Sequence, residues 1–137
     1  FMGVDDPHRS FDSLSRMERS LESLQSEDIL DDSSPELTIG VAHAPYQRIL
    51  NEFVSLGAEV IFAGHTHGGQ VCVPGYGALV TNCDIPRDQV KGLSTWHHGG
   101  HSAALNVSAG VGTSIYAPVR FACPPEATLI TLTARDA

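Results

Sequence analysis

The sequence is poor in basic residues, and this shortage excludes one class of partner. Its 137 residues include eight lysines and arginines against sixteen aspartates and glutamates, for a formal net charge of −8. Proteins that bind nucleic acid along the phosphate backbone need a cluster of positive charges. We therefore expect no nucleic-acid partner. A small phosphorylated substrate stays compatible with this composition, because a bound metal ion can supply positive charge locally.

Long apolar runs and a cysteine framework are missing as well. No run approaches the roughly 20 apolar residues that cross a bilayer, and the first residues do not have the pattern of a signal peptide. Cys72, Cys83 and Cys123 are odd in number, far apart and outside any C-x-x-C pattern, so we interpret them as reduced, mostly buried thiols. These features predict a cytoplasmic protein, with any membrane association arising from a segment outside this chain.

The remaining composition is that of one domain. Apolar residues make up 42% of the chain, which is enough to bury a core. An apolar stripe with acids between its members predicts an amphipathic helix over residues 10–29, and we expect a second helix after Pro45 that ends at Gly57. Residues 1–4 read as the end of a strand, and residues 37–42 and 60–63 as buried strands.

The second half of the chain is richer in turns. We expect strands over residues 70–73, 104–108 and 127–133, and irregular structure over residues 82–103, which contain Pro86 and three glycines. The order of strand, helix, strand, helix and then mostly strands predicts a mixed α/β sandwich in which the later strands form a second sheet.

Histidines follow two of the predicted strands directly. His43 comes after residues 37–42, while His65 and His67 come after residues 60–63. If these strands are neighbours, their carboxyl ends bring the three imidazoles to the edge where open α/β sheets bind ligands. Imidazole is a common ligand for zinc, iron and manganese. Ordinary polar residues at strand ends are the alternative, but a histidine pair bracketed by glycines has little packing purpose.

These segments carry a family resemblance. Residues 64–70 read Gly-His-Thr-His-Gly-Gly-Gln and resemble the last signature motif of the calcineurin-like metallophosphoesterases; residues 41–45, Val-Ala-His-Ala-Pro, resemble the motif before it. The flanks are similar to one bacterial branch of that family, and the similarity covers nearly the whole chain. These flanks are residues 3–7, residues 110–114, and Arg120 with residues 125–126 and 129–132.

The resemblance implies a fold, a chemistry and a set of roles. The fold would be the C-terminal half of a four-layer αββα sandwich with mixed sheets. The chemistry would be hydrolysis of a phosphomonoester or phosphodiester by a water that two divalent ions (manganese, iron or zinc) activate. His43 and His65 would bind one ion and His67 the other, and Gly68 and Gly69 would contact the substrate.

The chain also departs from the family pattern. The Gly-Asp and Gly-Asn-His motifs, which the family places upstream together with an Asp-x-His motif, do not occur in it, and the Asp-x-His spacing occurs only at Asp6-Pro7-His8. We therefore expect residues 1–137 to be the C-terminal part of a single domain whose N-terminal metal-binding half is absent, and to be inactive alone. We interpret Asp5 and Asp6 as turn residues rather than edge residues of the site. The missing half is an expected partner, and exposed strand edges predict a homodimer.

Other features admit plainer interpretations. The histidines of residues 97–101 are more typical of an exposed loop than of a metal tract. Residues 110–114 are glycine-rich but have no lysine of a P-loop, so we expect a turn that borders the site.

Two alternatives to the enzyme stay open. One is a non-catalytic scaffold or binding module that retains the phosphoesterase fold, and the other is a protein that binds a single ion through the three histidines.

Overall fold

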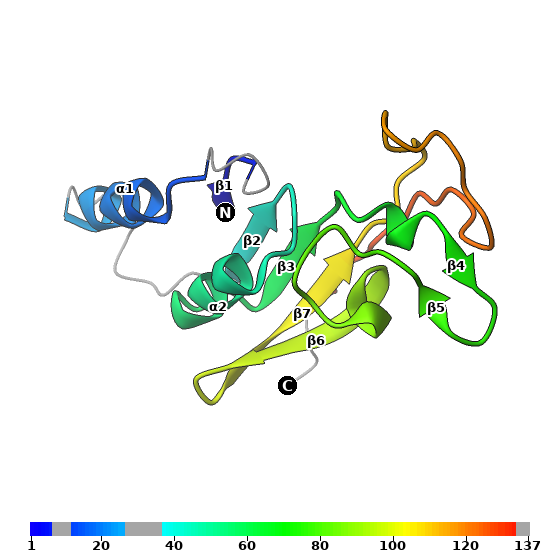
Figure 1. Cartoon of the computed structure of the whole chain (residues 1–137). Helices are drawn as coiled ribbons and strands as arrows, with labels where there is room; N and C mark the ends of the chain where they lie inside the picture. Colours follow the sequence, from blue (N-terminus) through cyan, green and yellow to red (C-terminus); the bar gives the residue numbers. More distant parts are fainter. Residues whose placement is uncertain (7–11, 27–36, 134–137) are drawn as a thin grey trace.

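The computed structural model describes residues 1–6, 12–26 and 37–133. Its centre is a five-stranded sheet in which β1, β2, β3 and β7 run parallel and β6 is antiparallel to β7 (Figure 1). In spatial order the strands are β1 (Met2–Val4), β2 (Ile39–Ala42), β3 (Val60–Ala63), β7 (His101–Val107) and β6 (Gly92–His98). Because four strands are parallel, the segments that follow them all leave the sheet at the same edge.

Helix α2 (Gln47–Ser55) covers one face of this sheet. Its buried side chains are Ile49, Leu50, Phe53 and Val54. Phe53 packs so closely on β2 that a Cβ at Gly40 would lie 2.5 Å from its ring. The Asp84 carboxylate accepts a hydrogen bond from the backbone N–H of Gln47 at 2.8 Å, where a negative charge offsets the positive end of the helix dipole.

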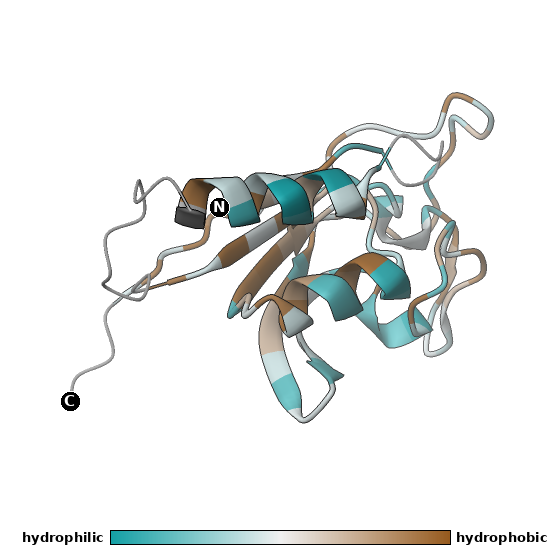
Figure 2. Cartoon of the chain, turned by 90° about the vertical axis from the view of Figure 1, so that its left-hand side faces the viewer, coloured by the Kyte–Doolittle hydropathy of each residue, from teal (hydrophilic) through white to brown (hydrophobic). Residues whose placement is uncertain are grey.

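Helix α1 (Leu14–Ser26) lies along β1. Figure 2 shows the two helices in front of the sheet, with hydrophilic stretches on their outer surfaces. The predicted helix over residues 10–29 is confirmed for Leu14–Ser26, whereas residues 10, 11 and 27–29 lie outside the described part of the chain. No helix among the described residues is long and apolar enough to span a bilayer.

The hydrophobic core lies between α2 and the middle of the sheet. Trp96 on β6 is buried in this core, and its indole N–H donates to the Asn51 side chain of α2 at 2.9 Å. Cys72 and Cys123 are buried free thiols and Cys83 is a half-buried one, as the cysteine pattern predicted. The fully buried side chains of helix and sheet include Phe53, Ile49, Leu50, Ile61, Leu105 and Val107.

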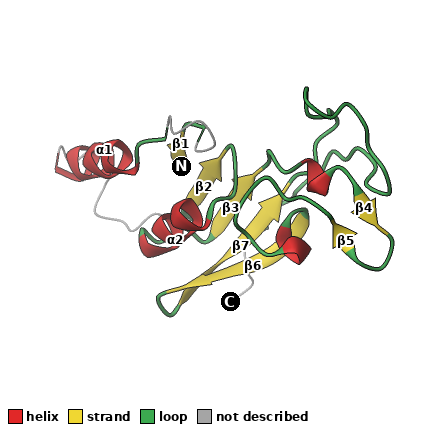
Figure 3. Ribbon diagram, viewed as in Figure 1, coloured by secondary structure: helices red, strands yellow, loops and turns green. Residues whose placement is uncertain are grey.

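Beyond β3 the chain forms a smaller substructure. A 3₁₀ turn, η2 (His67–Gly69), leads into a two-stranded antiparallel sheet of β4 (Cys72–Val73) and β5 (Gly77–Ala78), and a second 3₁₀ turn, η3 (Arg87–Gln89), precedes β6 (Figure 3). The predicted strand over residues 70–73 is therefore confirmed only in its last two residues.

The expectation of irregular structure over residues 82–103 is wrong for most of that segment. Strand β6 begins at Gly92, and β7 begins at His101 rather than at residue 104. Gly99 and Gly100 form the two-residue turn between them, with φ values of 57° and 83°. Two adjacent glycines with positive φ permit the tight turns whose twist matches a hairpin, so this pair marked a hairpin rather than an interruption.

The expected second sheet of later strands is also corrected. Strands β6 and β7 extend the first sheet, and residues 127–133 form no strand in the described chain. Leu129 in that segment is 95% exposed. A strand needs a neighbour to complete its backbone hydrogen bonds, and the described residues offer none to this segment. The observed α/β fold thus contains one mixed five-stranded sheet and one small hairpin.

Candidate functional site

The carboxyl ends of β2 and β3 place two of the predicted histidines side by side. The strands are parallel neighbours, and the Gly64 N–H donates to the His43 carbonyl at 3.0 Å just beyond them. The His43 Nε2 and His65 Nδ1 atoms lie 2.9 Å apart, and the ring planes meet at 65°. The structure therefore brings His43 and His65 together at the predicted edge of the sheet.

The separation of these two nitrogens allows a test of whether they suit a metal ion. Two imidazole nitrogens that bind one ion at about 2.0–2.1 Å lie about 2.9 Å apart at a right angle and about 3.3 Å apart at a tetrahedral angle. The 2.9 Å separation equals that of two ligands of one ion at a right angle, and it is also the length of the hydrogen bond that joins the two rings here. Within the described residues, however, no group of three or more His, Cys, Asp or Glu side chains is gathered closely enough to hold a metal. The described residues therefore contain no complete set of metal ligands.

His67 lies in the turn that follows, and its backbone is strained. His65, His67 and Gln70 have φ values of 67°, 51° and 55°, a region that costs non-glycine residues roughly 1–3 kcal/mol each. The buried Thr66 hydroxyl stabilises the turn by donating to the Val90 carbonyl at 2.7 Å and accepting from the Gly68 N–H at 3.2 Å. Such strain persists only where the surrounding structure enforces it, which is common at functional sites.

The surroundings of His67 favour its neutral form. Burial lowers the pKa of the imidazole below 6.5, the positive charge of Arg120 lowers it further, and a hydrogen bond to the Gly112 carbonyl acts in the opposite direction. Neutral imidazole is the form that binds metal ions. His43 is close enough for its charge to affect the same pKa, but His67 does not join the two other histidines in a single metal-binding cluster.

The two glycines predicted to contact substrate are closely packed. Gly68 and Gly69 are buried and have φ values of 65° and 84°. A Cβ at Gly68 would lie 2.7 Å from the Cys123 sulfur, and one at Gly69 would lie 2.1 Å from the Ala78 Cβ. Only glycine fits both the backbone and the space there. Their role in substrate binding stays a prediction.

The structure adds one residue whose position the sequence pattern did not reveal. The Arg120 guanidinium donates to the carbonyls of His67 at 3.0 Å and of Ala109 at 2.7 Å, and so links two loops at this edge of the sheet. Arg120 stands 53 positions from His67, and no local spacing connects the two. The resemblance included Arg120 only as part of a closing segment.

Residues 110–114 border this region, as predicted. The Ser114 N–H donates to the Gln70 side-chain oxygen at 2.7 Å, which ties the loop to the turn of His67. Asp5 and Asp6 leave β1 at the same edge, and the Asp6 N–H donates to the Asp5 carboxylate at 2.7 Å. Their place in a turn stays a prediction.

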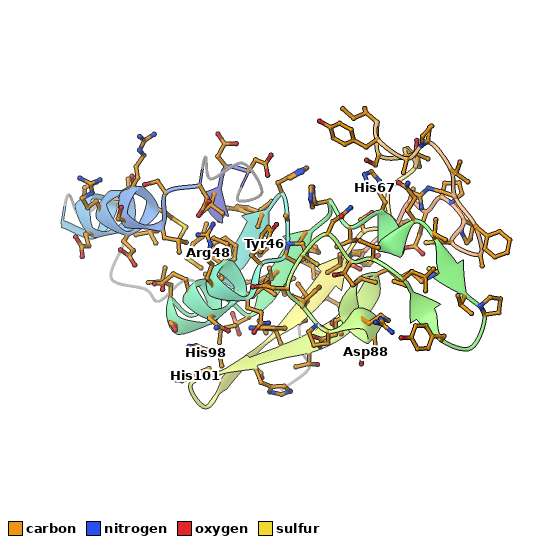
Figure 4. The ribbon with its side chains drawn as sticks, in the orientation of Figure 1. Tyr46, Arg48, His67, Asp88, His98 and His101 are labelled. Carbon is orange, nitrogen blue, oxygen red and sulfur yellow. The ribbon has the colours of Figure 1, made fainter. Side chains whose placement is uncertain are left out.

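The second histidine-rich segment lies elsewhere. Figure 4 shows His98 and His101 at the far end of the β6–β7 hairpin, opposite the end of the sheet that carries His67. His97, His98 and His101 are all exposed, as predicted, but they belong to paired strands rather than to a loop.

Comparison with known proteins gives one informative similarity. The chain is 37% identical over 70 residues to a Bacillus subtilis (strain 168) protein named "Uncharacterized metallophosphoesterase YkuE". The match covers 51% of this chain and 22% of YkuE, so the chain spans only about a fifth of the length of that relative. No family model and no solved structure matches the chain. The similarity suggests the metallophosphoesterase family.

Proposed function

We propose that this chain supplies histidine ligands to a metal-dependent phosphoester hydrolase of the metallophosphoesterase family. The observation that carries the proposal is the contact between His43 and His65, whose ring nitrogens lie 2.9 Å apart beyond two neighbouring parallel strands. Two motifs that are separate in the sequence thus meet at one point, as ligands of a shared ion must. The similarity to YkuE supports the same family.

In this proposal the three histidines divide between two divalent ions, manganese, iron or zinc. His43 and His65 bind one ion and His67 binds the other. When bound, such ions would stabilise negative charge on a phosphoryl group and lower the pKa of a bound water. The chain's own contribution is to hold the imidazoles at fixed positions, and burial lowers the pKa of His67, which favours the neutral form that can bind a metal ion. The substrate class is small phosphomonoesters or phosphodiesters, including lipid head groups.

We further propose that the remaining ligands and a second sheet belong to a preceding half of the same domain. The support is an apolar groove on the sheet, lined by side chains of three strands and of the last described segment. A second sheet packed there would cover side chains that now face water and would complete a four-layer sandwich. Without carboxylates from that half, residues 1–137 are inactive alone. Among the groove residues are Val60, Phe62, Leu93, Ala104, Asn106 and Leu129.

The test compares the complete gene product with the 137-residue chain. Both are purified free of metal, supplied with manganese and assayed with bis(p-nitrophenyl) phosphate and p-nitrophenyl phosphate. We expect turnover by the complete product and none by the 137-residue chain. Turnover by the short chain at an enzymatic rate would show that the upstream motifs are dispensable. Absence of turnover and of metal binding in the complete product would contradict the proposal itself.

One observation favours a second candidate, a non-catalytic scaffold that keeps the fold. The described residues gather no group of three potential ligands, which is also what a partly lost metal site would show. Counting metal ions per molecule of the complete gene product separates the candidates. Two ions with turnover indicate the enzyme, one ion without turnover indicates a single-ion protein, and no ion indicates the scaffold.

A further inference from the structure

We infer that Arg120 is the positioning residue for His67, because it fixes both the backbone of the His67 turn and the carbonyl that orients the His67 imidazole. The inference rests on the proposed function, in which His67 is a metal ligand. It assigns to Arg120 a role in building the site rather than in touching the substrate.

The contacts of the guanidinium are almost entirely with backbone carbonyls. Its Nη1 donates to the His67 carbonyl at 3.0 Å, and its Nη2 donates to the carbonyls of Ala109 and Gly110 at 2.7 and 2.9 Å. Its Nε donates to the Gly112 carbonyl at 3.0 Å, and weaker contacts reach residues 123 and 124. No carboxylate of the described residues forms an ion pair with it. The cation therefore holds three loop segments together.

This arrangement requires the shape of arginine as well as its charge. Arginine presents five N–H donors in a planar fork, whereas lysine is a compact charge on a flexible stem. Loop carbonyl oxygens that are left without donors in a partly buried region destabilise the fold, because no hydrogen bond offsets the loss of their hydration. Since its donors are committed to the loop backbone, the guanidinium orders the loops and is not available to bind a phosphoryl group.

The link from Arg120 to the imidazole passes through one carbonyl. The oxygen of Gly112 accepts from the Nε of Arg120 at 3.0 Å, and the backbone of Gly112 lies close enough to the His67 ring to raise its pKa. A histidine that binds a metal through one nitrogen commonly donates its other ring N–H to a carbonyl or carboxylate, which fixes its tautomer and orientation. In this inference the Gly112 carbonyl is that acceptor, and Arg120 holds it in place.

The experiment uses the complete gene product with Arg120→Ala and Arg120→Lys, and Arg87→Ala as the matched control. Arg87 carries the same charge but stacks on the Tyr76 ring at 4.4 Å, away from the loop carbonyls. Manganese affinity is measured by titration calorimetry. The tautomer of His67 is measured in the metal-free protein by long-range ¹H–¹⁵N NMR.

We expect both Arg120 variants to lose about 10–100-fold in manganese affinity, the range typical of lost outer-shell partners. His67 should change from one tautomer to a mixture, and millimolar guanidinium ion should restore affinity to Arg120→Ala. Arg87→Ala should behave as the wild type does. A merely structural role would lower stability without moving the tautomer and without rescue by guanidinium.

The outcomes separate this inference from the function on which it rests. If Arg120→Ala fails to fold, Arg120→Lys decides the result. The inference is overturned if the wild type binds manganese and Arg120→Lys has the same manganese affinity and the same His67 tautomer. The proposed function would still stand in that case. A wild type that binds no manganese overturns both.

Discussion

The two histidine-rich regions of this molecule have similar compositions but differ in how tightly the surrounding residues pack against them. His43, His65 and His67 follow two parallel strands, and two of them have positive φ values in a turn with buried glycines. The histidines of the β6–β7 hairpin are exposed on either side of Gly99 and Gly100, where an added Cβ would meet no atom within 4 Å. One region is tightly constrained by its surroundings and the other is open.

The number of histidines in a short stretch of sequence is therefore a poor predictor of a functional site. The hairpin packs three histidines into five positions, yet they project into water from paired strands. The other region has its histidines 22 positions apart and brings two of them into contact. What distinguishes a candidate site is the enforced convergence of side chains, together with backbone strain that the surroundings maintain.

The strongest test of the comparison removes one imidazole from each region. His65→Ala should lower the manganese affinity of the complete gene product by more than about 100-fold, because loss of a direct ligand exceeds the roughly 10–100-fold loss of an outer-shell partner. His98→Ala should leave the affinity unchanged. Titration calorimetry measures both variants, and equal effects would abolish the distinction between the two regions.

The next test compares the glycines of the two turns. Gly69→Ala places a Cβ 2.1 Å from the Ala78 Cβ at a φ of 84°, and should destabilise the protein by about 3 kcal/mol or more through overpacking and strain. Gly100→Ala meets no neighbouring atom at a φ of 83°, and should cost about 1 kcal/mol. Urea unfolding of both variants gives the difference; a smaller cost at Gly69 would mean that the turn is loosely packed.

A smaller effect is expected where the open hairpin is attached to the core. Trp96→Phe removes the N–H that donates to Asn51 at 2.9 Å and should lower the free energy of unfolding by about 1 kcal/mol. His97→Ala, at the neighbouring exposed position, should cost less than about 0.5 kcal/mol. Thermal unfolding by circular dichroism measures both, and equal shifts would show that the indole hydrogen bond contributes nothing.

The smallest effect concerns pH at the hairpin end of the sheet. Burial raises the pKa of Glu52 above 4.5, a hydrogen bond to Glu18 and its charge raise it further, and His98 opposes them. The folded state therefore binds more protons than the unfolded state, and this contribution to stability is lost as pH rises above 4.5 through the folded pKa. Glu52→Gln should stabilise the protein at pH 7 by up to about 0.5 kcal/mol, since water screens the pair.

The corresponding measurement is the melting temperature of wild type and Glu52→Gln near pH 4 and pH 7. The gain should appear at the higher pH and vanish at the lower one, where the carboxyl of the wild type is already protonated. A gain of equal size at both values would mean that the substitution acts through packing rather than through charge.

Several elements could be predicted from local pattern because their signals are local. Strand β3 was predicted at its observed bounds, since an apolar run of four residues between Glu59 and Gly64 has one simple interpretation. Helix α2 followed from its apolar spacing and from Gly57, which has a φ of 85°. Strand β6 was missed because most of its positions are exposed, so its pattern lacks the apolar alternation of a strand.

Some residues of the candidate site could likewise be predicted from the local sequence, and others could not. The pattern of residues 64–70 predicted His65 and His67 as site residues, because both histidines and the glycines beside them lie within one short stretch of sequence. The hydrogen bonds of Arg120 could not be predicted from the sequence. Their acceptors are backbone carbonyls, and every residue has a backbone carbonyl whatever its type.

The sequence alone specifies which groups this protein contains: three histidines in two motifs, the glycines that let one turn form, and an excess of acidic over basic residues. Only the tertiary structure decided which groups meet. The parallel pairing of β2 with β3 set the 2.9 Å contact between His43 and His65, and the approach of residue 120 to residue 67 set the environment of the third imidazole. Local patterns report the preferences of single segments, whereas the distance between segments follows from how the whole sheet is paired and packed.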